Sequence, residues 1–360
     1  MWRIDRLLYQ KEKSLWERAL LFPLYLLSLL YGGAVRTRVL FYSIGFRTSK
    51  RLPCPVISVG NITVGGTGKT TLVMALAKGL MERGTPVAIL SRGYKRKRSS
   101  EPLVSDGQTI FLSPEESGDE PFLMSEALQG IPVLVGKDRY VTGQIALRRF
   151  GVRGLLLDDG YQHLQLHRDL DILLIDSHIG FGDGHLLPRG VLREPFAHLR
   201  RAHLFLFTKA EHLETCQELE AVLRRTHPSS QVFHSHYEPM GLIGPGREWE
   251  ELPSFRGKRV LALSGIASPD SFAFLLRRCG MEIVEEAIYP DHHPYNTKDL
   301  AHIEEKSRGV DWVVTTEKDM VKLRKLNINR LPIRALRIEV RIREGEDFYK
   351  RVMEIFGVKS

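Results

Sequence analysis

The chain has 360 residues, of which 43% are hydrophobic and 26% are charged. This composition is typical of folded globular proteins and excludes an intrinsically disordered chain, and the length is sufficient for two domains. The formal net charge of +9 indicates an anionic partner, which could be a nucleotide, a nucleic acid, an anionic lipid or a phosphorylated substrate. The three cysteines, at positions 54, 216 and 279, have no C-x-x-C spacing and predict free thiols in a reducing compartment.

The first fifty residues are unusually rich in apolar and basic side chains. Residues 1–18 form a basic, weakly amphipathic stretch, and residues 19–31 are apolar except for Pro23 and Ser28. This apolar run is shorter than the roughly 20 residues that span a bilayer, and the glycine pair at positions 32 and 33 is expected to end it. The flanking residues are basic, so we predict a segment at the headgroup level of an anionic cytoplasmic leaflet. A transmembrane helix and a helix buried in the protein are the alternatives.

The strongest motif lies at residues 56–71, where a short apolar strand leads into a glycine-rich turn, a Lys-Thr pair and the start of a helix. Glycines let several backbone N–H groups point at one anion, and the helix dipole adds to the attraction. Lys69 can then reach the β- and γ-phosphates of a nucleotide, and the Thr70 hydroxyl can bind Mg²⁺. Thr63 replaces the first glycine of the G-x-x-x-x-G-K-[ST] pattern, and an ordinary glycine-rich turn is the alternative. The predicted nucleotide-binding residues are Gly65, Gly66, Thr67, Gly68, Lys69, Thr70 and Thr71.

Alternating helices and strands continue after this loop. The pattern predicts a helix over residues 72–83, which ends at Gly84, and a strand over residues 87–91. Five of the seven residues 92–98 are basic, and they follow that strand at the edge of the sheet where ligands bind in α/β proteins. A solvated charged loop is the alternative.

A second nucleotide-site element is predicted at residues 154–159. An apolar strand there ends in two acids, Asp158 and Asp159. In nucleotide sites, a carboxylate after such a strand holds Mg²⁺ directly or through water. Many strands end in aspartate, so the prediction depends on the glycine-rich loop that precedes it.

The pattern changes around residues 226–258, where prolines and glycines indicate a hinge or linker. Further strands and helices after it predict a smaller α/β domain. A loop at residues 289–295 contains His292 and His293 between two prolines, and residues 316–319 could line the same cleft. A surface histidine pair is the alternative.

Seven segments of the chain together resemble one family, the tetraacyldisaccharide 4'-kinases of lipid A biosynthesis. Each segment alone is weakly diagnostic, but they follow the family order between residues 50 and 325, and Thr63 in the glycine-rich loop is typical of that family. The segments are residues 60–70, Ser91-Arg92-Gly93-Tyr94, Gly118-Asp119-Glu120-Pro121, Asp158-Asp159-Gly160-Tyr161-Gln162-His163, Leu192-Arg193-Glu194-Pro195, Asp291-His292-His293-Pro294 and Thr316-Glu317-Lys318-Asp319.

This resemblance implies an α/β fold: a P-loop NTPase-like α/β/α sandwich, a second, smaller α/β/α domain with the active site between the two, and an N-terminal membrane-associated helix. The expected parts are a membrane-associated helical segment (1–35), a P-loop kinase domain (36–233), a linker (234–248), a smaller α/β domain (249–335), and a return linker strand with a C-terminal helix (336–360).

The resemblance also implies an activity. The enzyme would transfer the γ-phosphate of ATP, with Mg²⁺, to the 4'-hydroxyl of a tetraacyldisaccharide 1-phosphate and so form lipid IVA. It would lie on the cytoplasmic face of the inner membrane as a peripheral or monotopic protein, with the acylated disaccharide and the anionic membrane surface as partners. We expect a monomer. We also expect no binding of nucleic acid, because no aromatic-basic module is recognisable.

By the same resemblance, Asp119 is the expected catalytic base and His292 its partner. A carboxylate can accept the proton of a sugar hydroxyl, and a histidine beside it can orient it or relay the proton. If Asp119 belonged to the P-loop domain and His292 to the other, domain closure would assemble the pair. The expected metal-binding residues are Thr70, Asp158 and Asp159, and the expected substrate-binding residues are Arg92, Asn61, Glu120, His163 and Glu194.

A membrane-associated P-loop switch ATPase or GTPase is the main alternative function. Switch ATPases of the cell-division type carry a lysine immediately before the Gly-Gly of the loop, and Val64 occupies that position here. The guanine-reading N-K-x-D motif is matched poorly, because Thr208 replaces the asparagine and Glu211 replaces the aspartate.

Overall fold

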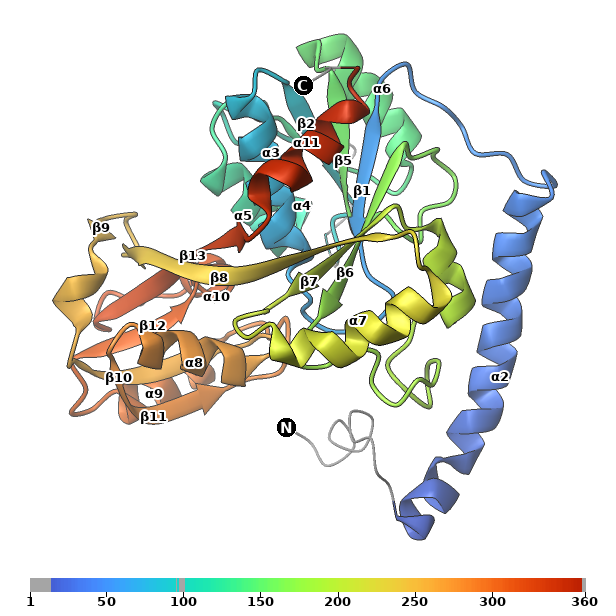
Figure 1. Ribbon diagram of the computed structural model, residues 1–360. Coiled ribbons are helices and arrows are strands. Elements are labelled where there is room, and N and C mark those ends of the chain that lie inside the picture. Colours follow the sequence, from blue (N-terminus) through green and yellow to red (C-terminus); the bar gives the residue numbers. More distant parts are fainter. Residues whose placement is uncertain (1–13, 95, 97–100, 358–360) are drawn as a thin grey trace. The chain divides into compact units, whose positions relative to one another are not determined.

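The computed structural model of the chain describes residues 14–94, 96 and 101–357 (Figure 1). The chain divides into two compact units. The first unit contains the residues up to Arg92, Ile131–His236 and the residues from Arg341 onward, and the second contains Gly93–Gly130 and Tyr237–Val340. The predicted amphipathic stretch over residues 1–18 lies mostly outside the described residues, as do three members of the basic run, at positions 95, 97 and 98.

A parallel sheet forms the centre of the first unit. Its strands lie in the order β7, β6, β1, β5, β2 and β4, and the first part of β8 pairs with β7. The central strands are buried along their whole length, which explains why most of their residues are apolar. The strands are β1 (Val56–Gly60), β2 (Val87–Ser91), β4 (Val133–Val135), β5 (Gly154–Asp158), β6 (Leu170–Asp176), β7 (Leu204–Thr208) and β8 (Gln231–Ile243).

Helices cover this sheet. α3 packs against β1, β2 and β5, and α6 packs against β2 and β4. The C-terminal helix α11 lies beside α3, where the Tyr349 hydroxyl donates to the backbone oxygen of Ala75 (3.1 Å). The helices are α3 (Lys69–Glu82), α6 (Arg139–Phe150), η1 (Phe196–Arg201), α7 (Glu214–Thr226) and α11 (Gly345–Glu354).

The second unit contains a smaller parallel sheet, in the order β11, β10, β12 and β13. Its core is formed by aliphatic side chains of these strands together with Ile303, Met320 and Leu323 from the covering helices. The elements are β3 (Leu103–Ser105), α4 (Pro114–Ser117), α5 (Asp119–Ala127), β9 (Trp249–Glu250), η2 (Leu252–Phe255), β10 (Arg259–Ser264), α8 (Pro269–Arg278), β11 (Glu282–Ile288), α9 (Thr297–Lys306), β12 (Trp312–Thr316), α10 (Glu317–Leu323) and β13 (Ile333–Ile342).

Residues 93–130 differ from the expected domain bounds, which placed them in the P-loop domain (36–233). The contacts group them with the second unit because α5 packs against α10. An ion pair between Glu126 and Arg324 (3.1 Å) reinforces this packing. The predicted linker over residues 234–248 is mostly the long strand β8, which contains residues of both units, as β13 does.

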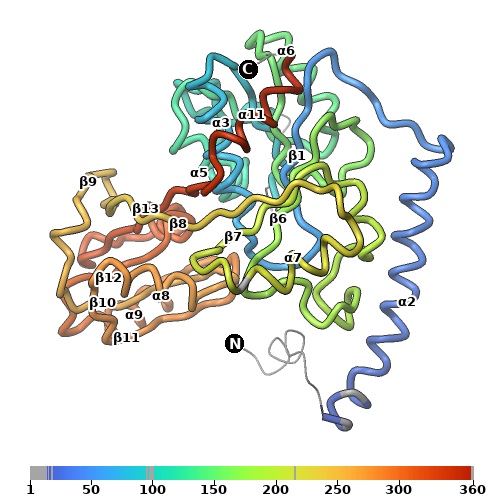
Figure 2. The backbone as a smooth tube through the Cα atoms, in the orientation of Figure 1, coloured from blue at the N-terminus to red at the C-terminus, as the bar shows by residue number. Residues whose placement is uncertain are grey.

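The N-terminal helix α2 (Leu15–Ser43) is longer than expected. The helical segment was expected to end at residue 35, but the helix passes through Gly32 and Gly33 and continues to Ser43. A Cβ atom on Gly32 would lie 2.7 Å from Leu186, so this glycine lets the helix approach the rest of the first unit closely. Figure 2 follows α2 as an unbroken coil.

One face of α2 contacts the first unit and the remainder is exposed. The Tyr31 hydroxyl donates to the backbone oxygen of Arg193 (2.9 Å), and Tyr25 packs edge-on against His185. Large apolar side chains project away from these contacts, namely Trp16, Leu20, Phe22, Leu26, Leu27, Leu29 and Leu30. By length and composition, Ala19–Ser43 could cross a membrane, so the argument that the segment is too short to span no longer holds.

Candidate functional site

The glycine-rich loop joins β1 to α3 at the carboxyl edge of the first sheet. Gly65 and Gly68 have φ values of 109° and 83°, a left-handed backbone that side-chain-bearing residues rarely adopt. Gly68 directly precedes the first helical residue, Lys69. The loop therefore leads into the free N–H groups of a helix N-terminus, which is the arrangement that binds phosphate.

The Asn61 side chain holds this loop through hydrogen bonds to two of its residues. Its side chain is fully buried, and its Nδ2 donates to the Thr67 hydroxyl (2.9 Å). Its Oδ1 accepts a hydrogen bond from Lys69 Nζ (3.3 Å). The geometry makes Asn61 a residue that holds the loop and aims Lys69, whereas the resemblance implied a substrate contact.

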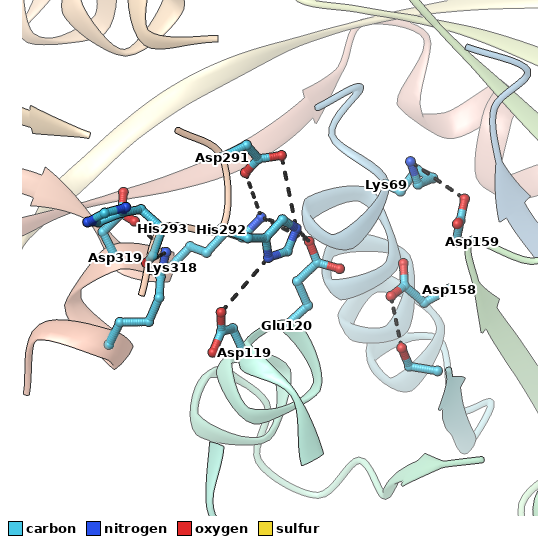
Figure 3. A network of polar contacts seen from close by, with 12 residues as sticks. Lys69, Asp119, Glu120, Asp158, Asp159, Asp291, His292, His293, Lys318 and Asp319 are labelled. Atoms are coloured by element: carbon cyan, nitrogen blue, oxygen red, sulfur yellow. Dashed lines mark hydrogen bonds and ion pairs between the residues drawn. The ribbon is translucent and has the colours of Figure 1, made fainter. Parts of the chain in front are cut away.

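Two acids stand at the end of β5: Asp158 is its last residue, and Asp159 follows it and lies near Lys69. Asp159 Oδ1 is 3.6 Å from Lys69 Nζ, and Asp159 also accepts hydrogen bonds from Arg193 (3.1 Å). Burial tends to raise the pKa of Asp159, but the charges of Lys69 and Arg193 outweigh it and lower that pKa. Asp158 is 3% exposed and accepts a hydrogen bond from the Ser91 hydroxyl (3.2 Å). Both carboxylates are therefore held at the carboxyl edge of the sheet (Figure 3).

The donor set near the loop fits Mg²⁺ bound together with nucleotide phosphates. Among the described residues, no cluster of three or more His, Cys, Asp or Glu side chains could hold a metal ion by itself. Mg²⁺ commonly takes only one or two protein carboxylates plus phosphate oxygens and waters. Thr70, Asp158 and Asp159 supply a hydroxyl and carboxylates of this kind.

A buried cation, which the sequence reasoning missed, lies at the start of α6. Arg139 is 4% exposed, and its Nη1 donates to the backbone oxygen of Lys137 (3.2 Å). Its Nε has no hydrogen-bond partner among the described residues. Burial and the nearby charge of Arg92 lower the Arg139 pKa, while the charges of Asp158 and Asp159 act in the opposite direction. In the part of the chain that the structure describes, no carboxylate bonds to Arg139, and a buried charge of this kind is costly, so this residue indicates an anionic ligand beside the loop.

Two other expected substrate residues lie near Arg139. Arg92 has an exposed side chain. Burial and the charges of Arg139 and Arg168 lower the pKa of His163 to about 4, so its imidazole is neutral near pH 7. No hydrogen-bond partner for its buried Nε2 occurs in the described part of the chain.

Glu194 is engaged by the protein itself. It is 3% exposed and accepts hydrogen bonds from Gln162 (3.0 Å), His198 (2.7 Å) and Arg201 (2.7 Å). Burial tends to raise the pKa of Glu194, but the bond to His198 and the charge of Arg201 lower it. Through these three partners, the ionised Glu194 carboxylate holds the chain around residue 194 in place.

A second group of candidate residues lies within the second unit. Asp119 is the first residue of α5, and its Oδ2 is 3.9 Å from His292 Nδ1. Burial tends to raise the pKa of Asp119, but the interaction with His292 and the charges of Lys322 and Lys325 lower it below its usual value. Asp119 is therefore ionised at neutral pH. Since both residues belong to one unit, domain closure is not needed to bring them together, contrary to the earlier expectation.

Lys318 connects His292 to two more acids (Figure 3). Its Nζ lies 3.1 Å from His292 Nε2, 3.2 Å from Glu120 Oε1 and 3.3 Å from Asp291 Oδ1. The sequence reasoning noted the segment around Lys318 but gave this lysine no role. The available signal was a charged residue two positions after the end of β12, at Thr316.

His293 points to a different partner. Its Nε2 lies 2.9 Å from Asp299 Oδ2, and its ring packs against Tyr289. Adjacent histidines therefore have separate tasks: His292 faces Asp119, and His293 ties the loop to the start of α9.

The fold and these groups define a class of protein. A phosphate-binding loop with a lysine and two carboxylates, on a P-loop NTPase-like sheet, together with an aspartate–histidine pair, indicates a nucleotide-dependent phosphotransferase. The chain matches the LpxK family, described as tetraacyldisaccharide-1-P 4'-kinase, over residues 20–356. It belongs to this family, which confirms the resemblance and the predicted fold class.

Individual relatives agree with this assignment. The tetraacyldisaccharide 4'-kinase of Syntrophus aciditrophicus (strain SB) is 44% identical over 343 residues, which cover 91% of each chain. That of Geobacter sulfurreducens is 43% identical and covers 87% of each chain. The crystal structure of LpxK from Aquifex aeolicus in complex with ATP matches with 33% identity and a TM-score of 0.74, covering 94% of this chain and 99% of that one.

Proposed function

We propose that this chain transfers the γ-phosphate of ATP to the 4'-hydroxyl of a tetraacyldisaccharide 1-phosphate and forms lipid IVA in lipid A biosynthesis. The family match over residues 20–356 carries this proposal. The positions of Lys69, Asp119 and His292 support it, because they supply the groups that such a transfer requires.

The donor side uses the glycine-rich loop. Backbone N–H groups at the start of α3 and Lys69 Nζ bind the phosphates and stabilise the charge that develops on the transferring group. Asp159 and Asn61, which contact Lys69, aim it. Thr70, Asp158 and Asp159 would hold Mg²⁺, which when bound neutralises charge on the β- and γ-phosphate oxygens.

The acceptor side uses Asp119 as a general base. The sugar hydroxyl loses its proton to Asp119 while its oxygen forms a bond to the γ-phosphorus and the bond from that phosphorus to the β–γ bridging oxygen breaks, releasing ADP. General-base assistance of this kind is worth roughly 10²- to 10⁴-fold in rate. The lowered pKa keeps Asp119 ready to accept a proton at neutral pH.

Residues around the loop would bind the acceptor. Arg92, Arg139 and the neutral His163 form a cationic and polar group that suits an anionic substrate such as a sugar phosphate. Glu120, held by Lys318, could accept hydrogen bonds from sugar hydroxyls. Glu194 would act indirectly, by fixing the segment that carries Arg193.

Labelled ATP incubated with the full chain and a lipid A disaccharide 1-phosphate tests the proposed activity. The expected result is transfer of label to the lipid at the 4' position, dependent on Lys69 and Asp119. ATP or GTP hydrolysis without transfer to lipid would instead support the switch ATPase or GTPase.

We further propose that α2 holds the enzyme on the cytoplasmic face of the inner membrane and that the enzyme is a monomer. Exposed apolar residues on α2 support the membrane anchoring, since a run of such side chains marks an interaction surface. Basic residues that precede the last turn of α2, such as Arg36 and Arg38, suit anionic headgroups.

Flotation with phosphatidylglycerol-containing vesicles tests the anchoring. Replacing Leu20, Leu26 and Leu30 by serine should lower the fraction of protein that floats with the vesicles. The matched control replaces the exposed Val284 and Ile288 of β11 by serine and should leave flotation unchanged. Equal flotation of both variants would contradict anchoring by α2, and sedimentation in detergent tests the monomer.

A further inference from the structure

Lys318 has an unusually complete set of contacts. Its Nζ approaches three groups within 3.3 Å: Glu120 Oε1, Asp291 Oδ1 and His292 Nε2. A lysine ammonium has three N–H donors and no acceptor. The three contacts therefore use every donor of Lys318.

The side-chain amine of Lys318 is protonated in these surroundings. Burial tends to lower the pKa of Lys318, but the carboxylates of Glu120 and Asp291 outweigh this effect and raise it above the usual value. Lys318 must then donate to His292 Nε2, so that Nε2 acts as the acceptor. A neutral imidazole has one donor and one acceptor nitrogen, which places the hydrogen on Nδ1, the nitrogen that faces Asp119.

We propose that Lys318 is a positioning residue that fixes His292 in the neutral Nδ1–H tautomer, so that the Nδ1–H faces Asp119 Oδ2 at 3.9 Å and His292 does not relay the proton. This deepens the proposed function, on which its kinetic consequence rests. The charged groups around the imidazole are Asp119, Glu120, Asp291 and Lys318, and the Tyr94 ring packs edge-on against it.

The tautomer decides what His292 can do during transfer. Nδ1 already carries a proton, so the proton removed from the sugar hydroxyl stays on Asp119. The lone pair on Nε2 already accepts the hydrogen bond from Lys318 Nζ (3.1 Å), so neither ring nitrogen is free to take that proton. The role of His292 is then to orient the Asp119 carboxylate.

The backbone holds His292 for this contact. His292 has a φ of 60°, a left-handed conformation that is strained for a histidine. Its N–H donates to the backbone oxygen of Gly265 (3.3 Å), and the N–H of Gly265 donates to Asp319 (2.8 Å). Lys322 donates to the backbone oxygen of His293 (3.3 Å). One helix, α10, therefore fixes the loop through Asp319 and Lys322 and fixes the imidazole through Lys318.

Nitrogen-15 NMR of the full chain with labelled histidine tests the tautomer without turnover. Long-range correlations should show His292 with hydrogen on Nδ1, and these signals should be missing in His292→Gln. In Lys318→Met the hydrogen should move partly or wholly to Nε2. Lys306→Met, which removes a lysine paired with Glu285, is the matched control and should leave the pattern unchanged. An Nε2–H tautomer in the wild type, or an unchanged tautomer in Lys318→Met, would overturn the proposal.

Kinetics provide the second measurement. Lys318→Met should lower kcat roughly 10- to 100-fold by misplacing the base, with the KM for ATP changed less than about threefold because Lys318 is not in the phosphate loop. Lys318→Arg, which keeps the cation, should recover part of the loss. Wild-type kcat in Lys318→Met would contradict the positioning role. Absence of phosphate transfer by the wild type would contradict the proposed function while leaving the tautomer assignment testable by NMR, and the wild-type spectrum also serves if Lys318→Met does not fold.

Discussion

The nucleotide half and the Asp119–His292 half of the candidate site are built in opposite ways. Lys69, Asn61 and the turns around them come from one contiguous stretch, residues 60–71, and Asp159 adds a contact to Lys69 from outside it. The acceptor half combines α5, the loop before α9 and the start of α10, which are separated by up to 199 positions in the chain (119 to 318).

The two halves also use their lysines differently. Lys69 contacts one amide oxygen and one carboxylate, and the loop around it presents free N–H groups to a phosphate. All three N–H donors of Lys318 are used in contacts with protein groups. One lysine is placed to meet a ligand, whereas the other contacts His292 of the proposed catalytic pair, so variants of the two groups should separate binding from chemistry.

The largest effect is expected when the base is removed. Asp119→Ala should lower kcat roughly 10²- to 10⁴-fold, the usual contribution of a general base, with ATP affinity nearly unchanged. Asp270→Ala is a matched control, because Asp270 also lies in the first turn of a helix of the second unit. A Kd for ATP that rises in parallel with the loss of kcat would contradict the separation of the two halves.

Lys69→Ala should damage both steps. Loss of one charge-stabilising donor costs roughly 10²- to 10³-fold in turnover, and phosphate binding should weaken as well. Kinetics together with ATP titration measure this, and the exposed Lys350→Ala on α11 is the control. A fully active Lys69→Ala enzyme would overturn the nucleotide-site assignment.

Arg139→Gln should lower activity while sparing or raising stability. Removing a buried cation without a bonded counterion relieves a cost of folding, but the anionic substrate loses a contact, so kcat/KM should fall about tenfold, the effect of 1.4 kcal/mol. Thermal unfolding and kinetics on the same preparation test this. A strong loss of Tm with normal kcat/KM would show that Arg139 is structural.

The smallest effect concerns stability at acid pH. The His163 pKa is lowered to about 4 in the folded chain from a usual 6.5. As the pH falls, His163 is therefore protonated in the unfolded chain before it is protonated in the folded chain. The stability contributed by the neutral imidazole is present above pH 6.5 and is lost as the pH falls toward 4. His163→Gln should show a smaller drop in Tm between pH 6.5 and pH 4 than the wild type, and an identical drop would contradict the burial argument.

Much of the nucleotide half could be predicted from the sequence because it is local. A strand, a glycine turn and Lys69 in succession leave few other conformations, and Asp158 and Asp159 follow a strand whose apolar run identifies it. The length of α2 was underestimated because glycines commonly end helices. Gly32 instead lets the helix pack closely against Leu186.

Long-range relations in the acceptor half required the structure. Resemblance supplied Asp119 and His292, but their membership of one unit depends on α5 packing against α10, which no local pattern encodes. The contact of Lys318 with His292 and the unpaired Nε of Arg139 likewise depend on side chains brought together by folding.

The sequence by itself determined that this chain has the P-loop NTPase-like fold of the tetraacyldisaccharide 4'-kinase family. Its motifs and glycine turns depend on residues that are close together in the chain, so they can be identified without the fold. Only the tertiary structure decided which cations meet which carboxylates, because hydrogen-bond geometry and burial are properties of packed neighbours. That difference explains why Lys69 could be assigned from its motif, while Lys318 needed the fold.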